Sequence, residues 1–131
     1  MRLLVDSDFL FGLFVPDDAH HQRSKKIWGK LIKQDRDFFV LNITIQETAT
    51  VLSHKRGQPA AIAFVDKLSE LGLKKIDVDI DLEKEGWAIF KPQIKKGISF
   101  VDCANLAASR EFGIDGILSF DKFYPKKLLI R

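Results

Sequence analysis

Hydrophobic stretches of two kinds alternate along the chain. Short apolar runs that each end at a polar residue predict strands buried on both faces of a sheet. They lie at Leu3–Val5, Phe38–Leu41 and Gly116–Phe120, with weaker candidates at 74–79 and 127–130. Between them, apolar residues recur at helical spacing, as in helices that pack one face on a core. Strands that alternate with helices predict an α/β fold, a parallel sheet of four to five strands with helices on both faces.

Two of the expected helices begin with a capping-box pattern. Thr44 and Glu47 fit the pattern in the helix that follows the second strand. Ser99 and Asp102 fit it with the shorter acid in a later helix rich in small apolar residues. In such a box the first side chain accepts a hydrogen bond from the backbone of the fourth residue, and the acid reaches back to the first. Both acids therefore have a purely structural interpretation.

Length and composition indicate one globular domain over residues 1–131. Apolar residues make up 46% of the chain and charged residues 30%, which is ordinary for a soluble protein. The net charge of +3 permits a polyanionic partner, although lysines on solvated helix faces explain it equally well. The single Cys103 cannot form an internal disulfide, and Asp6 and Asp8 interrupt the first apolar stretch. We therefore expect no membrane segment and a cytoplasmic protein.

Four acids stand where predicted strands end or helices begin: Asp6, Glu47, Asp102 and Asp121. Each one alone can be read as a helix or turn cap. Taken together they suggest one site, because the carboxyl ends of parallel strands meet at one edge of the sheet. Converging carboxylates repel one another unless a cation lies between them, and Mg²⁺ or Mn²⁺ prefers oxygen ligands. Such an acidic metal site is suited to phosphodiester hydrolysis.

At these residues the chain resembles the PIN domain family over essentially its full length. The resemblance rests on Val5–Leu10, the helix that carries Glu47, Ser99–Ala108 and Leu118–Phe123. It is closest to the toxin half of VapBC toxin–antitoxin modules. The resemblance implies an endoribonuclease that depends on Mg²⁺ or Mn²⁺ and hydrolyses RNA. It also implies a small antitoxin that occupies the acidic groove, and a homodimer.

Carried onto this chain, the resemblance makes Asp6, Glu47, Asp102 and Asp121 the catalytic and metal-binding quartet. Ser119 would support the Asp121 end of the site by hydrogen bonding. The best candidates for contacts with the RNA backbone follow the last acid, and Lys95 and Lys96 are less well placed. These candidates are Lys122, Lys126 and Lys127.

Two residues depart from the family pattern. Asp8 stands where a small polar residue is common, so it either adds an outer acid or caps the first helix. Pro92 lies in a helical pattern that includes Ile94 and runs to Gly97, and predicts a kink or break there. The shape of that wall of the groove is therefore open.

The sequence is also compatible with other functions. A stand-alone PIN nuclease in RNA processing would need no antitoxin, and an inactive PIN scaffold would have no use for four acids that repel one another. A phosphoryl-receiver domain also places paired acids after its first strand, here Asp6 and Asp8. That domain would need an Asp after the third strand, where only Asp77 and Asp79 are available, and a Lys after the fifth.

Overall fold

The computed structural model describes residues 1–131 and is built on a five-stranded sheet in which every neighbouring pair of strands is parallel. β1 (Arg2–Val5) lies at the centre of the order β3-β2-β1-β4-β5. The other strands are β2 (Asp37–Leu41), β3 (Lys74–Ile76), β4 (Gly116–Leu118) and β5 (Leu129–Ile130). The predicted parallel sheet is confirmed. A receiver-type sheet has the order 2-1-3-4-5, so the strand order excludes the phosphoryl-receiver alternative.

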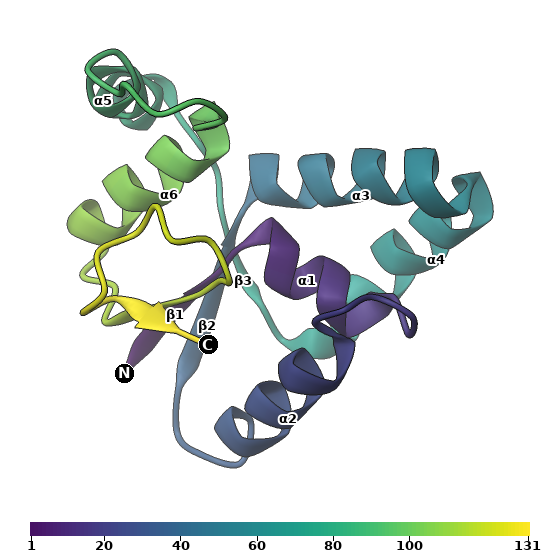
Figure 1. Cartoon of the computed structure of the whole chain (residues 1–131). Coiled ribbons are helices and arrows are strands. Elements are labelled where there is room, and N and C mark those ends of the chain that lie inside the picture. The colour runs from purple at the N-terminus through teal and green to yellow at the C-terminus, as the bar shows by residue number, and fades with distance from the viewer.

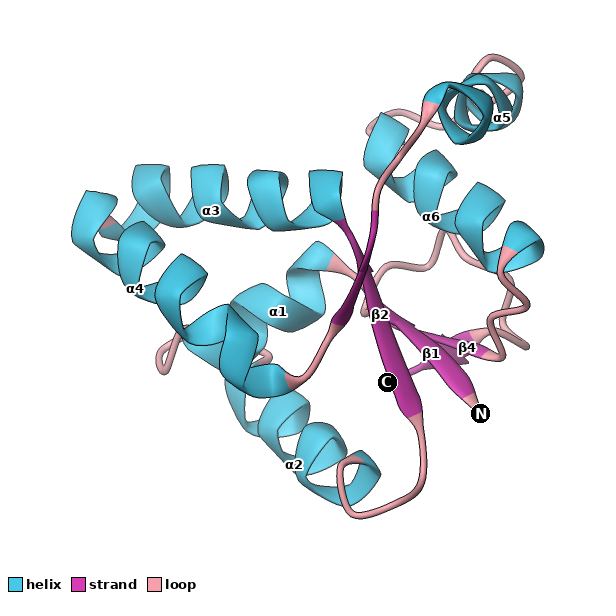
Figure 2. Ribbon diagram, turned by 180° about the vertical axis from the view of Figure 1, so that it is seen from behind, coloured by secondary structure: helices cyan, strands magenta, loops and turns pink.

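Helices cover both faces of the sheet, as predicted (Figures 1 and 2). One face carries the helices of the first half of the chain and the other carries the last two. The helices are α1 (Ser7–Phe14), α2 (His21–Leu31), α3 (Asn42–Arg56), α4 (Gln58–Leu68), α5 (Ile80–Phe90) and α6 (Phe100–Glu111), with a 3₁₀ turn at Ser69–Leu71. None of them combines the length and apolarity needed to cross a bilayer.

The alternation of side chains along β1 divides the core in two. Leu3 and Val5 face the first set of helices, where Phe9 and Phe64 are fully covered. Leu4 faces the opposite side and packs with the helices of the second half of the chain. Because β1 is buried on both faces, it holds its C-terminal end, and the acid that follows it, in a fixed place.

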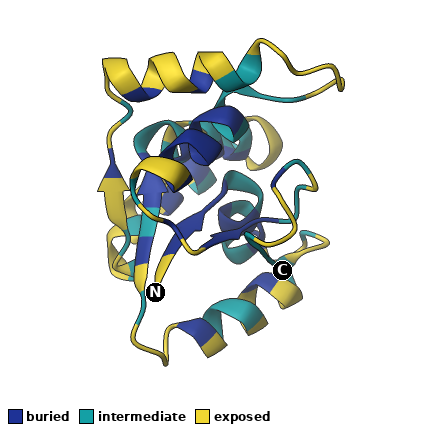
Figure 3. Ribbon diagram, turned by 90° about the vertical axis from the view of Figure 1, so that its left-hand side faces the viewer, coloured by how far each residue is buried: buried dark blue, intermediate teal, exposed yellow.

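α6 lies between the sheet and α5. Its residues from Cys103 to Ser109 are all buried, which small alanines permit by letting the helix approach the strands closely. α5 forms the outer layer and is mostly exposed in Figure 3. Gly86 allows this packing, because a Cβ there would come within 2.9 Å of the Phe100 ring. Cys103 is a buried, free thiol, as expected.

The capping box predicted at Thr44 and Glu47 is wrong. α3 begins at Asn42, two residues before Thr44, and its N-cap Leu41 makes no side-chain hydrogen bond. Thr44 is instead fully buried inside the helix, and its hydroxyl has no partner. The helix starts early because Asn42 Oδ1 accepts hydrogen bonds from Ile43 and from the distant Val78 backbone. A purely capping role for Glu47 is thereby removed.

The predicted kink or break at Pro92 is a break: α5 ends at Phe90, and the helical pattern extended to Gly97 is not continued beyond it. Pro92 cannot continue the helix, and the following residues form an exposed loop in which Ile94 is 96% exposed. Gly97 lies in this loop with φ of +88° rather than at a helix end. The loop therefore forms a wall that the sequence pattern assigned to a helix.

Candidate active site

Asp6 is the most enclosed of the four predicted acids. It follows β1 directly, is 2% exposed and caps α1 by accepting a hydrogen bond from the Ser7 backbone at 2.8 Å. Three side chains also donate to its carboxylate: Asn105 at 3.1 Å, Ser119 at 2.8 Å and Tyr124 at 3.1 Å. These contacts hold the carboxylate in one orientation at the edge where β1 and β2 end and α1 and α3 begin (Figure 1).

Burial makes three carboxylates of this edge, those of Asp6, Asp8 and Asp102, harder to ionise. Burial, and then the negative charge of Asp8, raise the pKa of Asp6 to about 7 despite the bonds it accepts. Burial also raises the pKa of Asp8. For Asp102, burial raises the pKa, and the charges of Asp121 and Glu47 add to the effect. The electrostatic coupling thus links all four predicted acids with Asp8 in one group.

Asp8 and Ser119 join α1 to the segment that carries Asp121. Asp8 Oδ2 accepts a hydrogen bond from the Phe120 backbone at 2.9 Å, while its Oδ1 is buried with no partner. Ser119 is fully buried, donates to Asp6 and accepts a hydrogen bond from the Asp121 backbone at 3.0 Å. The Ser119 hydroxyl therefore connects the first and last acids of the chain.

Asp102 has the capping role that the sequence predicted and a second one. Ser99 Oγ accepts from the Asp102 backbone at 3.0 Å, and Asp102 Oδ2 accepts from the Ser99 backbone at 3.1 Å, a complete capping box. Its other oxygen, Oδ1, lies 3.5 Å from the Tyr124 hydroxyl. Capping thus uses one oxygen of Asp102 and leaves the other facing Asp6 across Tyr124.

Sequence reasoning missed Asn105 and Tyr124. Asn105 is fully buried and donates both to Asp6 and to the Tyr124 hydroxyl, at 3.1 Å each. Tyr124 is 2% exposed, and its hydroxyl lies between Asp6 and Asp102. A signal was available, since Asn105 is one turn beyond Asp102 in an otherwise apolar stretch and Tyr124 is the only tyrosine.

Glu47 and Asp121 stand at the more open side of the group. Glu47 is half-buried in the second turn of α3, and Asp121 Oδ1 accepts a hydrogen bond from the Phe123 backbone at 3.0 Å. No three His, Cys, Asp or Glu side chains are arranged to hold one metal ion directly. The acids therefore share an electrostatic environment without forming a closed coordination shell.

These features fit Mg²⁺ or Mn²⁺. The available ligands are carboxylate oxygens, one of which, Asp8 Oδ1, is buried without a partner. Mg²⁺ keeps several of its waters and commonly takes only one or two carboxylates from the protein. An ion with retained waters does not require three side chains in direct contact. Its charge would favour the ionised carboxylates, whose pKa values are raised by burial first and by mutual repulsion second.

Two cavities flank the acids. One of about 650 Å³ lies between the loop after α5 and the segment after β4, and Asp121, Lys122, Lys95 and Lys96 line it. The other, of about 300 Å³, is lined by residues that include Asp8 and Glu47. Lys126 and Lys127 are exposed and lie outside both. The structure thus brings Lys95 and Lys96 closer to the acids than their sequence position suggested.

Comparison with known proteins identifies the same fold and family. The model of the PIN domain family matches residues 3–126. The chain is 28% identical over 119 residues to the 23S rRNA-specific endonuclease VapC20 of Mycobacterium tuberculosis, covering 91% of this chain and 88% of that protein. It is 29% identical to a VapC ribonuclease of Archaeoglobus fulgidus, covering 92% of this chain and 78% of the relative.

Solved structures agree with the sequence matches. The crystal structure of M. tuberculosis VapC20, described as a Sarcin-Ricin loop cleaving toxin, superposes with a TM-score of 0.82 at 26% identity. The match covers 92% of this chain and 91% of that one. The VapBC2 complex of Rickettsia felis, bound to a promoter DNA fragment, contains a chain that matches with a TM-score of 0.68 at 12% identity. That match covers 99% of this chain and 98% of that one, and at this identity it supports the fold alone.

Proposed function

This chain belongs to the PIN domain family, and from that premise we propose that it is a VapC-type endoribonuclease that needs Mg²⁺ or Mn²⁺. The observation that carries the proposal is the group of carboxylates that interact electrostatically at the edge of the sheet, in which Asp6 is buried and its pKa is raised to about 7. A fold has no structural need to bury acids that destabilise one another. A bound cation would offset their repulsion, so a metal site accounts for why these acids lie together.

Asp6, Glu47, Asp102 and Asp121 would hold the metal, and Asp8 would contribute its partnerless oxygen directly or through a water. When bound, a divalent ion lowers the pKa of an attacking water and stabilises the leaving oxygen of a phosphodiester. The protein itself orients the acids. Ser119, Asn105 and Tyr124 fix Asp6, and the capping box fixes Asp102. Preorganised ligands of this kind need no rearrangement when substrate arrives.

RNA would cross the edge of the sheet with its scissile phosphate at the acids. On one side, the 650 Å³ cavity offers the ammonium groups of Lys95, Lys96 and Lys122 next to Asp121. Lysines placed beside an acidic centre attract the phosphates that the acids alone would repel, and phosphate contacts position a strand without reading its sequence. Lys126 and Lys127 would contact the backbone further from the cut.

The partner that fits a VapC-type enzyme is a small antitoxin that covers the acidic edge. A guanidinium group pairs bidentately with carboxylates, so an antitoxin arginine is suited to insert among these acids. The proposed enzyme is a homodimer, as its resemblance to VapC-type toxins implies. The stand-alone nuclease differs only in lacking the antitoxin.

The enzymatic part of the proposal is tested by RNA cleavage with purified protein. We expect cleavage in millimolar Mg²⁺ or Mn²⁺, none in excess EDTA, and none by Asp6→Asn in either. Equal cleavage by wild type and Asp6→Asn, in preparations shown to be free of other nucleases, would contradict the proposal. Binding of RNA without any cleavage in metal would favour the inactive scaffold.

The toxin part is tested in cells. Expression of the wild type is expected to arrest growth, whereas Asp6→Asn is tolerated at equal soluble level. If a short reading frame adjoins this gene, its co-expression is expected to restore growth. Cleaving protein that leaves growth unaffected would instead favour the stand-alone nuclease.

A further inference from the structure

The smaller cavity beside the acids is lined by both charged and apolar side chains. Glu47, Val51 and Lys55 all line it, and their spacing of four residues places them on one face of α3. Asp8 and Phe11 line it from α1, one turn apart. Along α3, Glu47 therefore stands at one end, Val51 follows, and Lys55 stands about 12 Å from Glu47. Asp18 also lines the cavity.

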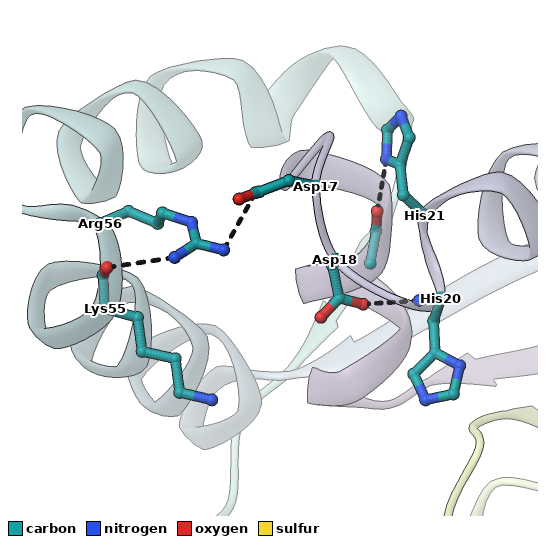
Figure 4. Close-up of polar contacts among 7 residues, drawn as sticks. Asp17, Asp18, His20, His21, Lys55 and Arg56 are labelled. Atoms are coloured by element: carbon teal, nitrogen blue, oxygen red, sulfur yellow. Dashed lines mark hydrogen bonds and ion pairs between the residues drawn. The ribbon is translucent and has the colours of Figure 1, made fainter.

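Lys55 is free of other charged partners. The neighbouring Arg56 forms the ion pair with Asp17, at 2.9 Å, and no such pair involves Lys55. The Lys55 ammonium instead lies 5.4 Å from the centre of the Phe11 ring. Figure 4 shows the Lys55 side chain extending away from the Arg56–Asp17 pair. A cation in this position is available to an anionic ligand in the cavity.

His20 also lines the cavity and contacts the segment that carries Asp121. Its ring stacks on Phe120, the residue before Asp121, with centroids 4.0 Å apart and planes at 8°. The turn that carries it is fixed by the Asp18 carboxylate, which accepts from the His20 backbone at 3.0 Å, and by a 2.7 Å contact of the His21 ring with the Gly12 carbonyl (Figure 4).

We propose that this cavity is a nucleotide subsite. It would take the RNA base next to the scissile phosphate, between His20 and the apolar wall of Phe11 and Val51, with Lys55 on the following phosphate. This inference rests on the proposed ribonuclease function and adds a determinant of sequence preference to it. A volume of about 300 Å³ is at the small end of ligand pockets and suits a single base. Aromatic walls favour nucleic-acid bases by stacking, and a lysine favours phosphate.

The subsite is tested by cleavage of a random-sequence single-stranded RNA pool in Mn²⁺, with sequencing of the cut ends and kinetics on one preferred oligonucleotide. The variants are His20→Ala and Lys55→Met, and Lys30→Met on α2 is the matched control. We expect both cavity variants to raise KM at least tenfold with little change in kcat. His20→Ala should also alter the base preference at one position beside the cut. Lys30→Met should match the wild type.

Other outcomes distinguish a failure of the proposed subsite from a failure of the proposed ribonuclease function. If the wild type cleaves in Mn²⁺ and both cavity variants match it in KM and base preference, the subsite is refuted and the ribonuclease proposal stands. If they cleave normally but no longer bind an antitoxin that binds the wild type, the cavity is a protein site and the RNA assignment is wrong. If the wild type does not cleave at all, both proposals fail.

Discussion

Asp6 combines four hydrogen-bond donors with a raised pKa, and the reason is its surroundings. Donors to a carboxylate favour its charged form, yet complete burial and the nearby Asp8 outweigh them. In the metal-free protein the residue therefore tends to keep a proton that its counterpart in the unfolded chain, with an ordinary pKa of 3.8, has already lost. In the proposed enzyme, a proton and the metal would compete for this carboxylate.

The first prediction concerns pH. Between about pH 4 and pH 7 the folded state binds a proton at Asp6 that the unfolded state lacks, so the stability of the metal-free protein falls as pH rises through this range. The fall should be at most about 1.4 kcal/mol per pH unit for this residue. Asp8 and Asp102 act in the same direction. Urea unfolding in EDTA at several pH values measures it.

The Asp6→Asn variant is the comparison for that series. It should flatten the pH dependence and be as stable as wild type or more so above pH 7 without metal. Millimolar Mn²⁺ should stabilise the wild type above pH 7 and the variant much less, by mass action. A wild-type stability that rises with pH in EDTA would contradict the assignment of the raised pKa.

Tyr124→Phe removes the hydroxyl that lies between Asp6 and Asp102 and little else. Groups that orient metal ligands commonly change metal affinity 10–100-fold when lost. We expect Mn²⁺ affinity, measured by calorimetry, to fall about tenfold. Ser109→Ala is the matched control, because it removes a buried hydroxyl that donates to the Leu106 carbonyl on the same helix. Equal Mn²⁺ binding by the wild type and both variants would mean that Tyr124 only fills space.

At the scale of elements, two helices place acids at the site by different means. α6 begins with a complete capping box, so Asp102 is held by local sequence. α3 begins without a side-chain cap and is held instead by Asn42, which bonds across to Val78. Glu47 therefore owes its place to packing between α3 and its neighbours rather than to the helix start.

The third prediction contrasts the two helix starts. Ser99→Ala should cost about 1 kcal/mol of stability, since it removes a working cap. Thr44→Val should be nearly neutral or stabilising, because it replaces a buried hydroxyl that has no partner. Urea unfolding of both variants in EDTA measures the two changes in the free energy of unfolding. A loss at Thr44 as large as that at Ser99 would mean that the Thr44 hydroxyl acts as the cap that the sequence pattern suggested.

At the scale of the whole molecule, the acids lie between two cavities. The larger cavity beyond Asp121 carries three lysines, and the smaller one beyond Glu47 carries Lys55. The modest net charge of +3 therefore understates how much positive charge lies beside the acids. Local placement of charge, rather than its total, governs the approach of a polyanion here.

The fourth prediction follows from this placement. Replacing Lys95, Lys96 and Lys122 by Met should weaken binding of a single-stranded RNA and reduce its salt dependence. Each lysine that contacts a phosphate contributes about 0.7 to the slope of log affinity against log salt. Fluorescence anisotropy in the Asp6→Asn background measures binding without cleavage. The comparison is the variant in which Lys126 and Lys127 are both replaced by Met. A larger loss of RNA affinity in that variant would mean that Lys126 and Lys127 make the main RNA contacts.

The sequence alone determined the layers and the positions of Asp6, Asp102 and Asp121. Buried strands and amphipathic helices are encoded by local periodicity, and helices between strands require the strands to run parallel. Parallel strands bring their carboxyl ends to one edge, so Asp6 and Asp121 could be assigned to that edge from the chain alone. The capping box at Ser99 and Asp102 was equally local, and it was predicted correctly.

Tertiary structure decided what surrounds those acids. Asn105 contacts Asp6 across 99 positions and Tyr124 contacts it across 118, so neither partnership is visible in a local pattern. Thr44 failed as a cap for the same reason, since the bond from Val78 to Asn42 comes from 36 residues away. Burial, and with it the raised pKa of Asp6, exists only once both faces of the sheet are covered. Local periodicity fixes which elements form, whereas contacts between distant elements set the chemistry of the site.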